Sequence, residues 1–203
     1  MTTEGRTGAG LEAVVLAAGS ARRFGGGKLT AAFSGGVLLD GALAAAFAAP
    51  VRSVVVVTGA QAPAVEAAAR AFARRIGQAA RLRIVHAPDH AEGMAASLRA
   101  GIASLPLDAE AAFIFLGDMP RVPQGAPPRL AEQIAQGHPA AAPVFEGRRG
   151  HPTIFARALF PDLMALRGDQ GARRVLDQAS AALVEAPDDG VLFDVDEPQD
   201  LGA

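Results

Sequence analysis

The sequence has no cysteine among its 203 residues. This absence excludes disulfides, thiolate zinc sites and cysteine nucleophiles, and it suits a reducing compartment. Long apolar runs are missing as well, since none approaches the roughly 20 residues that a membrane-spanning helix needs. The first thirteen residues, MTTEGRTGAGLEA, are polar and lack the apolar core of a secretory signal. We therefore expect a cytoplasmic protein with no membrane partner.

Tryptophan and tyrosine are also absent, and the ten phenylalanines lie mostly in apolar segments. Few aromatic side chains are therefore free to stack on a sugar ring. The charges nearly balance, with 19 basic and 21 acidic residues and a net charge of −2. Because no excess of positive charge would attract nucleic acid, we expect no nucleic-acid partner.

Four short apolar runs have the continuous character of strands that are covered on both faces. They are residues 13–17, 51–58, 82–86 and 112–116. Alanine-rich segments with a helical pattern lie between them, at residues 37–49, 62–76 and 94–104. Alternating strands and helices predict an α/β fold, a three-layer Rossmann-like, doubly wound and mostly parallel sheet.

The pattern loosens after Pro120, where we expect the following elements. They are helices at 124–137, 157–166 and 170–180, and strands at 140–145 and 153–155. No linker interrupts the chain, so we predict a single domain over residues 1–203, with residues 1–10 disordered. Ligands bind beyond the carboxyl ends of parallel strands, which directs attention to the loops after each strand.

The first such loop, Ala18–Lys28, combines four glycines with three cations, Arg22, Arg23 and Lys28. Glycines let the backbone approach a ligand closely, and the cations would suit phosphates. The loop lacks the GK[ST] ending of a P-loop and does not match GxGxxG leading directly into a helix. From the residues alone, a solvent-exposed loop and a phosphate-binding loop both remain open.

The stretch LAAGSARRFGGGK, residues 16–28, resembles the LAAGxSxRxGxxK signature of nucleotidyltransferases. It is similar to the molybdenum cofactor cytidylyltransferases of the MobA-like NTP transferase family. The resemblance implies that the loop wraps a triphosphate and that Arg23 and Lys28 are catalytic, nucleotide-binding cations. It assigns no role to Arg22. It also implies nucleotide binding by Leu16, Ala17, Ala18 and Gly19, and LAAG rather than LAGG favours CTP over GTP.

Two acidic motifs follow later in the chain. In AFIFLGDMP, residues 112–120, Asp118 ends a strand, where it would suit a hard cation such as Mg²⁺ or a simple turn. The GDMP resemblance implies that Asp118 is a catalytic metal ligand.

The second acidic motif lies near the end of the sequence. In DVDEPQDL, residues 194–201, the resemblance to [DN]x[DN]TPxDL implies that Asp196 is a second metal ligand. The resemblance assigns Asp194 less clearly, and we expect it to point away from the site. Asp200 is expected to begin a last helical turn.

Three further motifs match the same family. One of them, PDHAEGMAASLR at residues 88–99, resembles a GMxxSL motif and implies nucleotide contacts by Gly93 and Ser97. Met94 and Leu98 of this segment are expected to be buried.

The other two motifs come later in the chain. GRRGHPT, residues 147–153, resembles GxxGHP and implies that His151 binds the pterin substrate. GDQGAR, residues 168–173, resembles GDxGAR, so Asp169 is either a substrate-binding residue or a helix cap. His86, His90 and His138 receive no role.

These matches run in the expected order from residue 14 to residue 201. They imply an Mg²⁺-dependent enzyme that transfers CMP from CTP to molybdenum-bound molybdopterin, releases pyrophosphate and serves a molybdenum hydroxylase client. Two alternatives remain open. One is a related enzyme that uses GTP or acts on a sugar or polyol phosphate, because this fold hosts several activities. The other is a non-catalytic molybdenum cofactor maturation factor.

Overall fold

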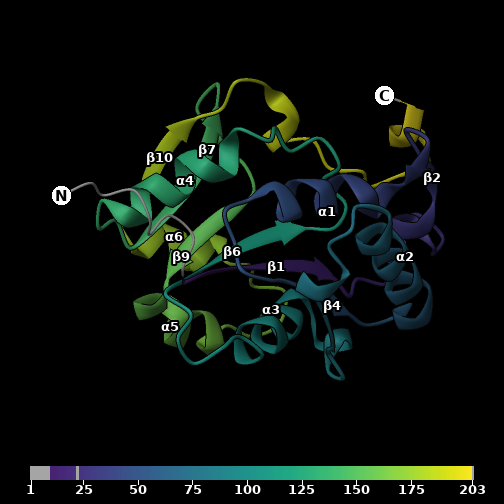
Figure 1. Ribbon diagram of the computed structural model, residues 1–203, viewed down its shortest axis with the longest axis horizontal. Coiled ribbons are helices and arrows are strands. Elements are labelled where there is room, and N and C mark those ends of the chain that lie inside the picture. The colour runs from purple at the N-terminus through teal and green to yellow at the C-terminus, as the bar shows by residue number, and fades with distance from the viewer. Residues whose placement is uncertain (1–9, 22, 203) are drawn as a thin grey trace.

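A computed structural model describes residues 10–21 and 23–202 and contains one large sheet between two layers of helices (Figure 1). The strand order is β10-β7-β9-β6-β1-β4-β5, with the short β8 paired to β7. The strands are β1 (Leu11–Ala17), β4 (Val54–Thr58), β5 (Leu82–His86), β6 (Ala111–Leu116), β7 (Ala140–Phe145), β8 (Arg148–Arg149), β9 (Thr153–Ala156) and β10 (Ala182–Glu185).

Two apolar cores lie on opposite faces of this sheet. One is shared with α1 (Leu38–Ala48), α2 (Ala62–Arg75) and α4 (Ala126–Ala135). The other is shared with α3 (Met94–Ala103), α5 (Phe160–Ala165) and α6 (Arg173–Gln178). Figure 1 shows α1 and α4 on one side of the sheet and α3 and α5 on the other. Successive strand residues alternate between the cores, as Val14 and Val15 do, which explains the continuous apolar runs. The predicted three-layer α/β fold is confirmed.

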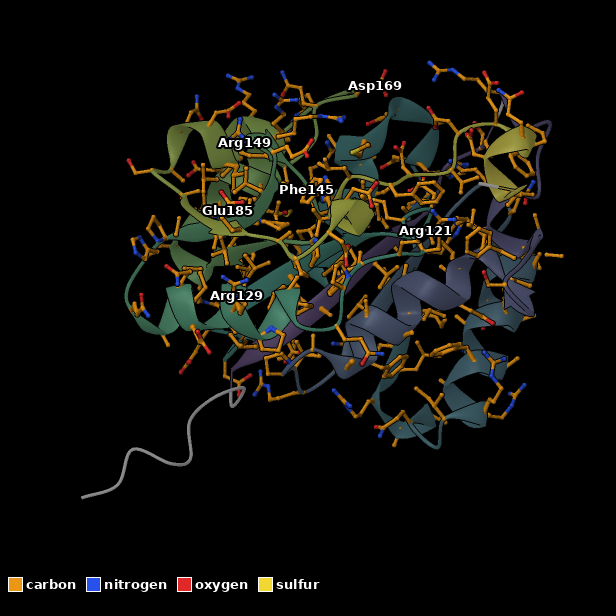
Figure 2. All side chains as sticks on the ribbon, turned by 90° about the horizontal axis from the view of Figure 1, so that it is seen from above. Arg121, Arg129, Phe145, Arg149, Asp169 and Glu185 are labelled. Carbon is orange, nitrogen blue, oxygen red and sulfur yellow. The ribbon has the colours of Figure 1, made fainter. Side chains whose placement is uncertain are left out.

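The sheet is mostly parallel, as expected, with an exception that the sequence did not reveal. β1 is parallel to β4 and β6, and β7 is parallel to β10, but β9 is antiparallel to both of its neighbours, β6 and β7. The edge strand β10 was not predicted either. Arg129 of α4 donates a hydrogen bond of 2.6 Å to the carbonyl of Glu185, which ties this edge strand to the helical layer (Figure 2).

Smaller elements complete the chain. A hairpin of β2 (Ala32–Phe33) and β3 (Gly36–Val37) precedes α1. Six short 3-10 helices are found in the described part of the chain: η1 (Lys28–Thr30), η2 (Ala79–Arg81), η3 (His90–Glu92), η4 (Arg157–Leu159), η5 (Asp189–Val191) and η6 (Pro198–Gly202). Of the ten N-terminal residues predicted to be disordered, 1–9 lie outside the described residues. Gly10 is buried and accepts a 2.7 Å hydrogen bond from the backbone of Glu110.

A buried carboxylate lies at the amino-terminal end of the central strands. Glu12 is only 1% exposed and accepts hydrogen bonds from Arg52 (2.8 Å) and from the hydroxyl of Ser53 (2.6 Å). Arg52 also pairs with Asp108 at 2.7 Å. These contacts join β1 to the segment before β4, and they satisfy a charge that would otherwise be costly to bury.

The opposite end of the sheet gathers the loops that carry the predicted motifs. Because β1, β4, β5 and β6 run parallel, their carboxyl ends meet at one edge. Within the described residues, no helix is both long enough and apolar enough to cross a bilayer.

Candidate active site

The glycine loop after β1 has a backbone that few other residues could adopt. Gly25, Gly26 and Gly27 all have positive φ angles, at 84°, 94° and 69°. The amide of Gly27 donates a 3.0 Å hydrogen bond to the side-chain carbonyl of Gln61, which anchors the loop to the start of α2. The loop ends directly in η1, so it delivers Lys28 to the edge of the sheet. Arg22 lies outside the described residues.

Lys28 makes three contacts with oxygens from distant parts of the sequence. Its Nζ lies 2.7 Å from Asp118 Oδ2, 2.7 Å from the carbonyl oxygen of Val195 and 3.8 Å from Asp196 Oδ1. The Lys28 side chain is only 11% exposed, so these interactions are poorly screened by solvent. Arg23 pairs with Asp196 at 3.2 Å from a position that is 77% exposed. The structure therefore brings Arg23, Lys28, Asp118 and Asp196 together.

The oxygens around Lys28 also suit a divalent cation. The ammonium group acts as a stand-in cation between the carboxylates of Asp118 and Asp196. Mg²⁺ in proteins commonly takes one or two carboxylates and completes its shell with water and phosphate oxygens. No group of three or more metal-binding side chains is found in the described ranges, so the two carboxylates are a partial ligand set. This set fits an ion that arrives with a nucleotide.

Neighbouring acidic residues shape this cluster. Burial, followed by the negative charges of Asp196 and Asp118, raises the pKa of Asp194 above its usual value. Asp194 therefore lies within electrostatic range of both carboxylates, although we expected it to point away. Asp200 accepts backbone hydrogen bonds from Asp196 (2.9 Å) and Glu197 (2.8 Å), which hold its pKa below the usual range. It braces the segment that carries Asp196, and it lies in η6, near the helical start that we expected.

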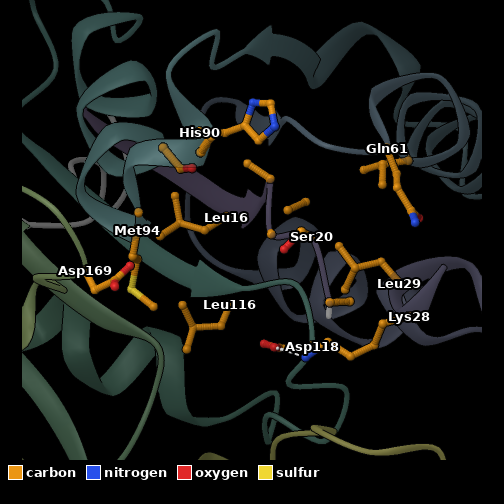
Figure 3. Close-up of a pocket in the computed structure, with 18 residues that line it drawn as sticks. Leu16, Ser20, Lys28, Leu29, Gln61, His90, Met94, Leu116, Asp118 and Asp169 are labelled. Atoms are coloured by element: carbon orange, nitrogen blue, oxygen red, sulfur yellow. Dashed lines mark hydrogen bonds and ion pairs between the residues drawn. The ribbon is translucent and has the colours of Figure 1, made fainter. Parts of the chain in front are cut away.

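A cleft of about 600 Å³ lies beside the Lys28–Asp118 pair (Figure 3). It contains most of the residues for which the sequence predicted nucleotide contacts. The predicted site residues that line it are Leu16, Ala17, Ala18, Gly19, Lys28, Gly93, Ser97, Asp118 and Asp169. Arg23, Asp196 and His151 are not part of its lining. The cleft is therefore a nucleotide-sized space bordered on one side by the charged cluster.

Gly93 lines the cleft, and its backbone conformation and close neighbours leave no room for a side chain. Its φ is 120°, and a Cβ there would lie 2.5 Å from Asp169 Oδ1 and from the Gly168 carbonyl. The Gly168–Asp169 turn folds over the start of α3, where the amide of Ala95 donates to the Gly168 carbonyl at 3.0 Å. Asp169 thus faces the cleft. It does not cap α6, whose N-cap is Ala172, so the helix-cap interpretation was wrong.

His151 lies outside the cleft but close to Asp118. Burial lowers the pKa of His151 below its usual value, more than the Ile114 backbone and the Asp118 carboxylate raise it. Among the described residues, two buried side-chain polar atoms have no hydrogen-bond partner: Nδ1 of His151 and the hydroxyl of Thr153. These two residues lie two positions apart, across a cis His151–Pro152 bond.

Sequence reasoning missed several residues that line the cleft. Gln61 follows β4, and His90 follows β5, so both are polar residues in strand-end loops; that position was the available signal. Ser20 lies in the glycine loop itself. Met94 was expected to be buried but is 44% exposed and lines the cleft, whereas Leu98 is fully buried as predicted.

Comparison with known protein families agrees with this geometry. The MobA-like NTP transferase domain matches residues 13–183, which include the glycine loop, Asp118 and His151. The chain belongs to the MobA-like NTP transferase family. It is therefore a member of a nucleotidyltransferase family, and the match covers most of its length.

Two relatives of this MobA-like chain are similar to it over nearly its full length. The molybdenum cofactor cytidylyltransferase of Escherichia coli is 23% identical over 94% of this chain and 93% of its own length. The purine catabolism protein PucB of Bacillus subtilis is 27% identical over 92% of each chain.

Solved structures of other proteins also superpose on most of this MobA-like chain. The Rv0371c homolog from Mycobacterium sp. strain JC1 superposes with a TM-score of 0.80 at 27% identity, covering 96% of this chain and 94% of its own. The manganese complex of Rv0371c from Mycobacterium tuberculosis has a TM-score of 0.70 at 23% identity, covering 88% and 89%. A nucleotidyl transferase from Methanothermobacter has a TM-score of 0.72 at 23% identity, covering 95% and 94%.

Proposed function

We propose that this MobA-like enzyme transfers CMP from CTP to the terminal phosphate of molybdenum-bound molybdopterin and releases pyrophosphate. The observation that carries the proposal is the convergence of Lys28, Asp118 and Asp196 at the edge of a 600 Å³ cleft. The LAAG sequence at residues 16–19 and the likeness to the E. coli cytidylyltransferase support CTP and the molybdenum cofactor as substrates.

The proposed reaction is a displacement at the α-phosphorus of CTP. A phosphate oxygen of the acceptor forms a new bond to the α-phosphorus, and the bond from this phosphorus to the bridging α–β oxygen breaks. Pyrophosphate leaves with that oxygen and its electron pair. The acceptor phosphate is already ionised, so His151 is not required as a general base and is assigned to acceptor binding.

The protein's part is positioning and charge stabilisation, which dominate phosphoryl-type transfers. Lys28 and Arg23 would turn from the carboxylates toward the triphosphate and offset its growing negative charge. Asp118 and Asp196 would hold Mg²⁺. Mg²⁺ supplies neutralisation of phosphate charge when bound, and Rv0371c, which has a similar fold, has been solved in complex with manganese.

His151 and Thr153 are suited to the acceptor side of the reaction. Both carry a buried polar atom without a hydrogen-bond partner in the described chain, and His151 is near Asp118 but outside the cleft. Buried polar groups without partners are uncommon, so this pair would gain stability from a hydrogen-bonding ligand. A substrate contact by Asp169 is also proposed, but on the nucleotide side, because Asp169 lines the cleft.

Pyrophosphate release tests the proposal. Purified protein with Mg²⁺ and the molybdenum cofactor is incubated with CTP, GTP or ATP in parallel. We expect release with CTP, and absence of release with all three nucleotides would contradict the proposal. Release with GTP alone, or only with a sugar or polyol phosphate as acceptor, would support the related-enzyme alternative.

The variant Asp118→Asn distinguishes the proposed enzyme from a non-catalytic maturation factor. If Asp118 has the proposed role, this variant loses turnover but still binds nucleotide. Unchanged maturation of a molybdenum hydroxylase client by the inactive variant would instead favour the maturation factor.

A further inference from the structure

His90 lines the cleft on the side opposite Lys28 and Asp118 in Figure 3. It is the first residue of η3, in the loop between β5 and α3. Lys28 and Asp118, where a triphosphate would bind, lie at the other side of the cleft, and the glycine loop runs from Ala18, beside Gly59 and His90, to Lys28. Around His90 the lining is mostly uncharged, with Ala91, Gly93 and Ser97 nearby in sequence. If the proposed function is correct, the base of the nucleotide lies at the His90 end.

The hydrogen bonding of His90 fixes which ring nitrogen carries the proton. Nδ1 lies 3.0 Å from the carbonyl oxygen of Ala87, and a carbonyl oxygen can only accept. Nδ1 must therefore donate. In a neutral imidazole the other nitrogen, Nε2, is then an acceptor. No residue of the described chain forms a hydrogen bond with Nε2.

The ring is also held in place by its surroundings. A Cβ at Gly59 would lie 2.7 Å from Cγ of His90, so the ring packs directly against the backbone after β4. The His86 ring contacts it edge-on, with 6.0 Å between centroids. The backbone amide of His90 donates to the same Ala87 carbonyl at 3.2 Å. A fixed acceptor in a recognition cleft discriminates better than a mobile one.

We propose that Nε2 of His90 accepts a hydrogen bond from the exocyclic amino group of the bound base and so selects cytosine over uracil. This inference rests on the proposed function, because it takes the cleft to be the nucleotide site. Cytosine carries an amino group where uracil carries a carbonyl oxygen, and the two bases are otherwise nearly identical in shape. With uracil, two acceptors would face each other, and neither would be satisfied.

Nucleotide binding without turnover tests this role. Calorimetric titration of the full-length protein with CTP and with UTP, in Mg²⁺ and without acceptor, gives the ratio of the two affinities. We expect the unchanged protein to prefer CTP by about 10- to 100-fold. The variant His90→Gln carries both a donor and an acceptor, and it should bring the two affinities within about threefold of each other. His90→Phe keeps a ring but no acceptor, and it should weaken CTP more than UTP.

A matched control is His86→Phe, which changes the neighbouring ring outside the cleft lining and should keep the CTP preference. Thermal unfolding of each variant checks that it is folded, and His90→Gln serves if His90→Phe is not. Equal binding of CTP and UTP by the unchanged protein, or an unchanged preference in His90→Gln, would overturn the role of His90 while leaving nucleotidyl transfer standing. Absence of binding by any nucleotide would overturn the role of His90 together with the proposed function.

Discussion

The ammonium nitrogen of Lys28 lies 2.7 Å from Oδ2 of Asp118, although 90 residues separate them in sequence. In the proposed reaction these two residues have different partners, a triphosphate for Lys28 and a metal ion for Asp118. In the structure each of the two side chains satisfies the other's charge. A metal–nucleotide complex would therefore have to break the Lys28–Asp118 ion pair in order to bind both residues.

Removing the Lys28 charge should separate metal binding from catalysis. In Lys28→Met, we expect pyrophosphate release to fall by about 100- to 1,000-fold, because a charge-stabilising group is lost. The same change removes the cation that lies between Asp118 and Asp196, while Arg23 still pairs with Asp196. Mn²⁺ without nucleotide should therefore bind more tightly, as measured by electron paramagnetic resonance. Tighter Mn²⁺ binding together with lost turnover is the expected signature, and Mn²⁺ affinity that stays the same or falls would contradict it.

Gly19 tests the close approach of the ligand to the glycine loop. A Cβ at Gly19 would meet no atom within 4 Å, so Gly19→Ala should leave the free energy of unfolding unchanged. Gly19 lines the cleft, however, and the added methyl group should weaken nucleotide binding by about 10-fold or more. The matched control is Gly125→Ala, which also meets open space but lies outside the cleft lining. Equal nucleotide affinity in both variants would argue against close phosphate contact.

The Glu12 network should govern stability without affecting the site. Glu12→Ala leaves Arg52 and Ser53 without their buried partner, and we expect a loss of about 3 kcal/mol in the free energy of unfolding by urea. Asp108→Ala removes the solvent-exposed carboxylate from the same arginine, and its effect should be much smaller. Similar losses in the two variants would show that the buried partner has no special importance.

His151 predicts a dependence of stability on pH. Burial lowers its pKa below the usual 6.5, so the folded state favours the neutral ring. The unfolded chain binds a proton as the pH falls through about 6.5 before the folded protein does, and stability therefore decreases below that pH. Above that pH both states are neutral, and the full stability is present.

Melting temperatures from pH 8 to pH 5 check the His151 prediction. His151→Asn should show a shallower decrease than the unchanged protein, whereas His138→Asn, an exposed control, should follow the unchanged protein. A steep decrease that persists in His151→Asn would assign the pH dependence to other groups.

The sequence predicted the central fold because its strands are buried on both faces and its helices are rich in alanine. It did not reveal the direction of β9, since apolar residues such as Ile154 and Phe155 suit either orientation. The edge strand β10 was missed because it is short and half-exposed, with Leu183 open to solvent. Local residue patterns do not record which strand a segment will pair with.

The site residues that the sequence placed together correctly are those in motifs that follow one another in the order typical of the family. Lys28, Asp118 and Asp196 meet as expected, and the loops after parallel strands explain why. His90 and Gln61 lie in such loops but match no motif, so only the structure shows that they line the cleft. Asp169 was expected to bind substrate or to cap a helix. It lines the cleft because its turn folds over Gly93, a contact between segments far apart in sequence.

The most direct test of the account is a crystal structure with Mn²⁺ and a non-hydrolysable CTP analogue, in which anomalous scattering locates the metal. We predict a manganese peak bound by the carboxylates of Asp118 and Asp196, with the amine of Lys28 moved onto the phosphates. A metal bound elsewhere, or Lys28 still paired with Asp118 beside a bound nucleotide, would contradict the account.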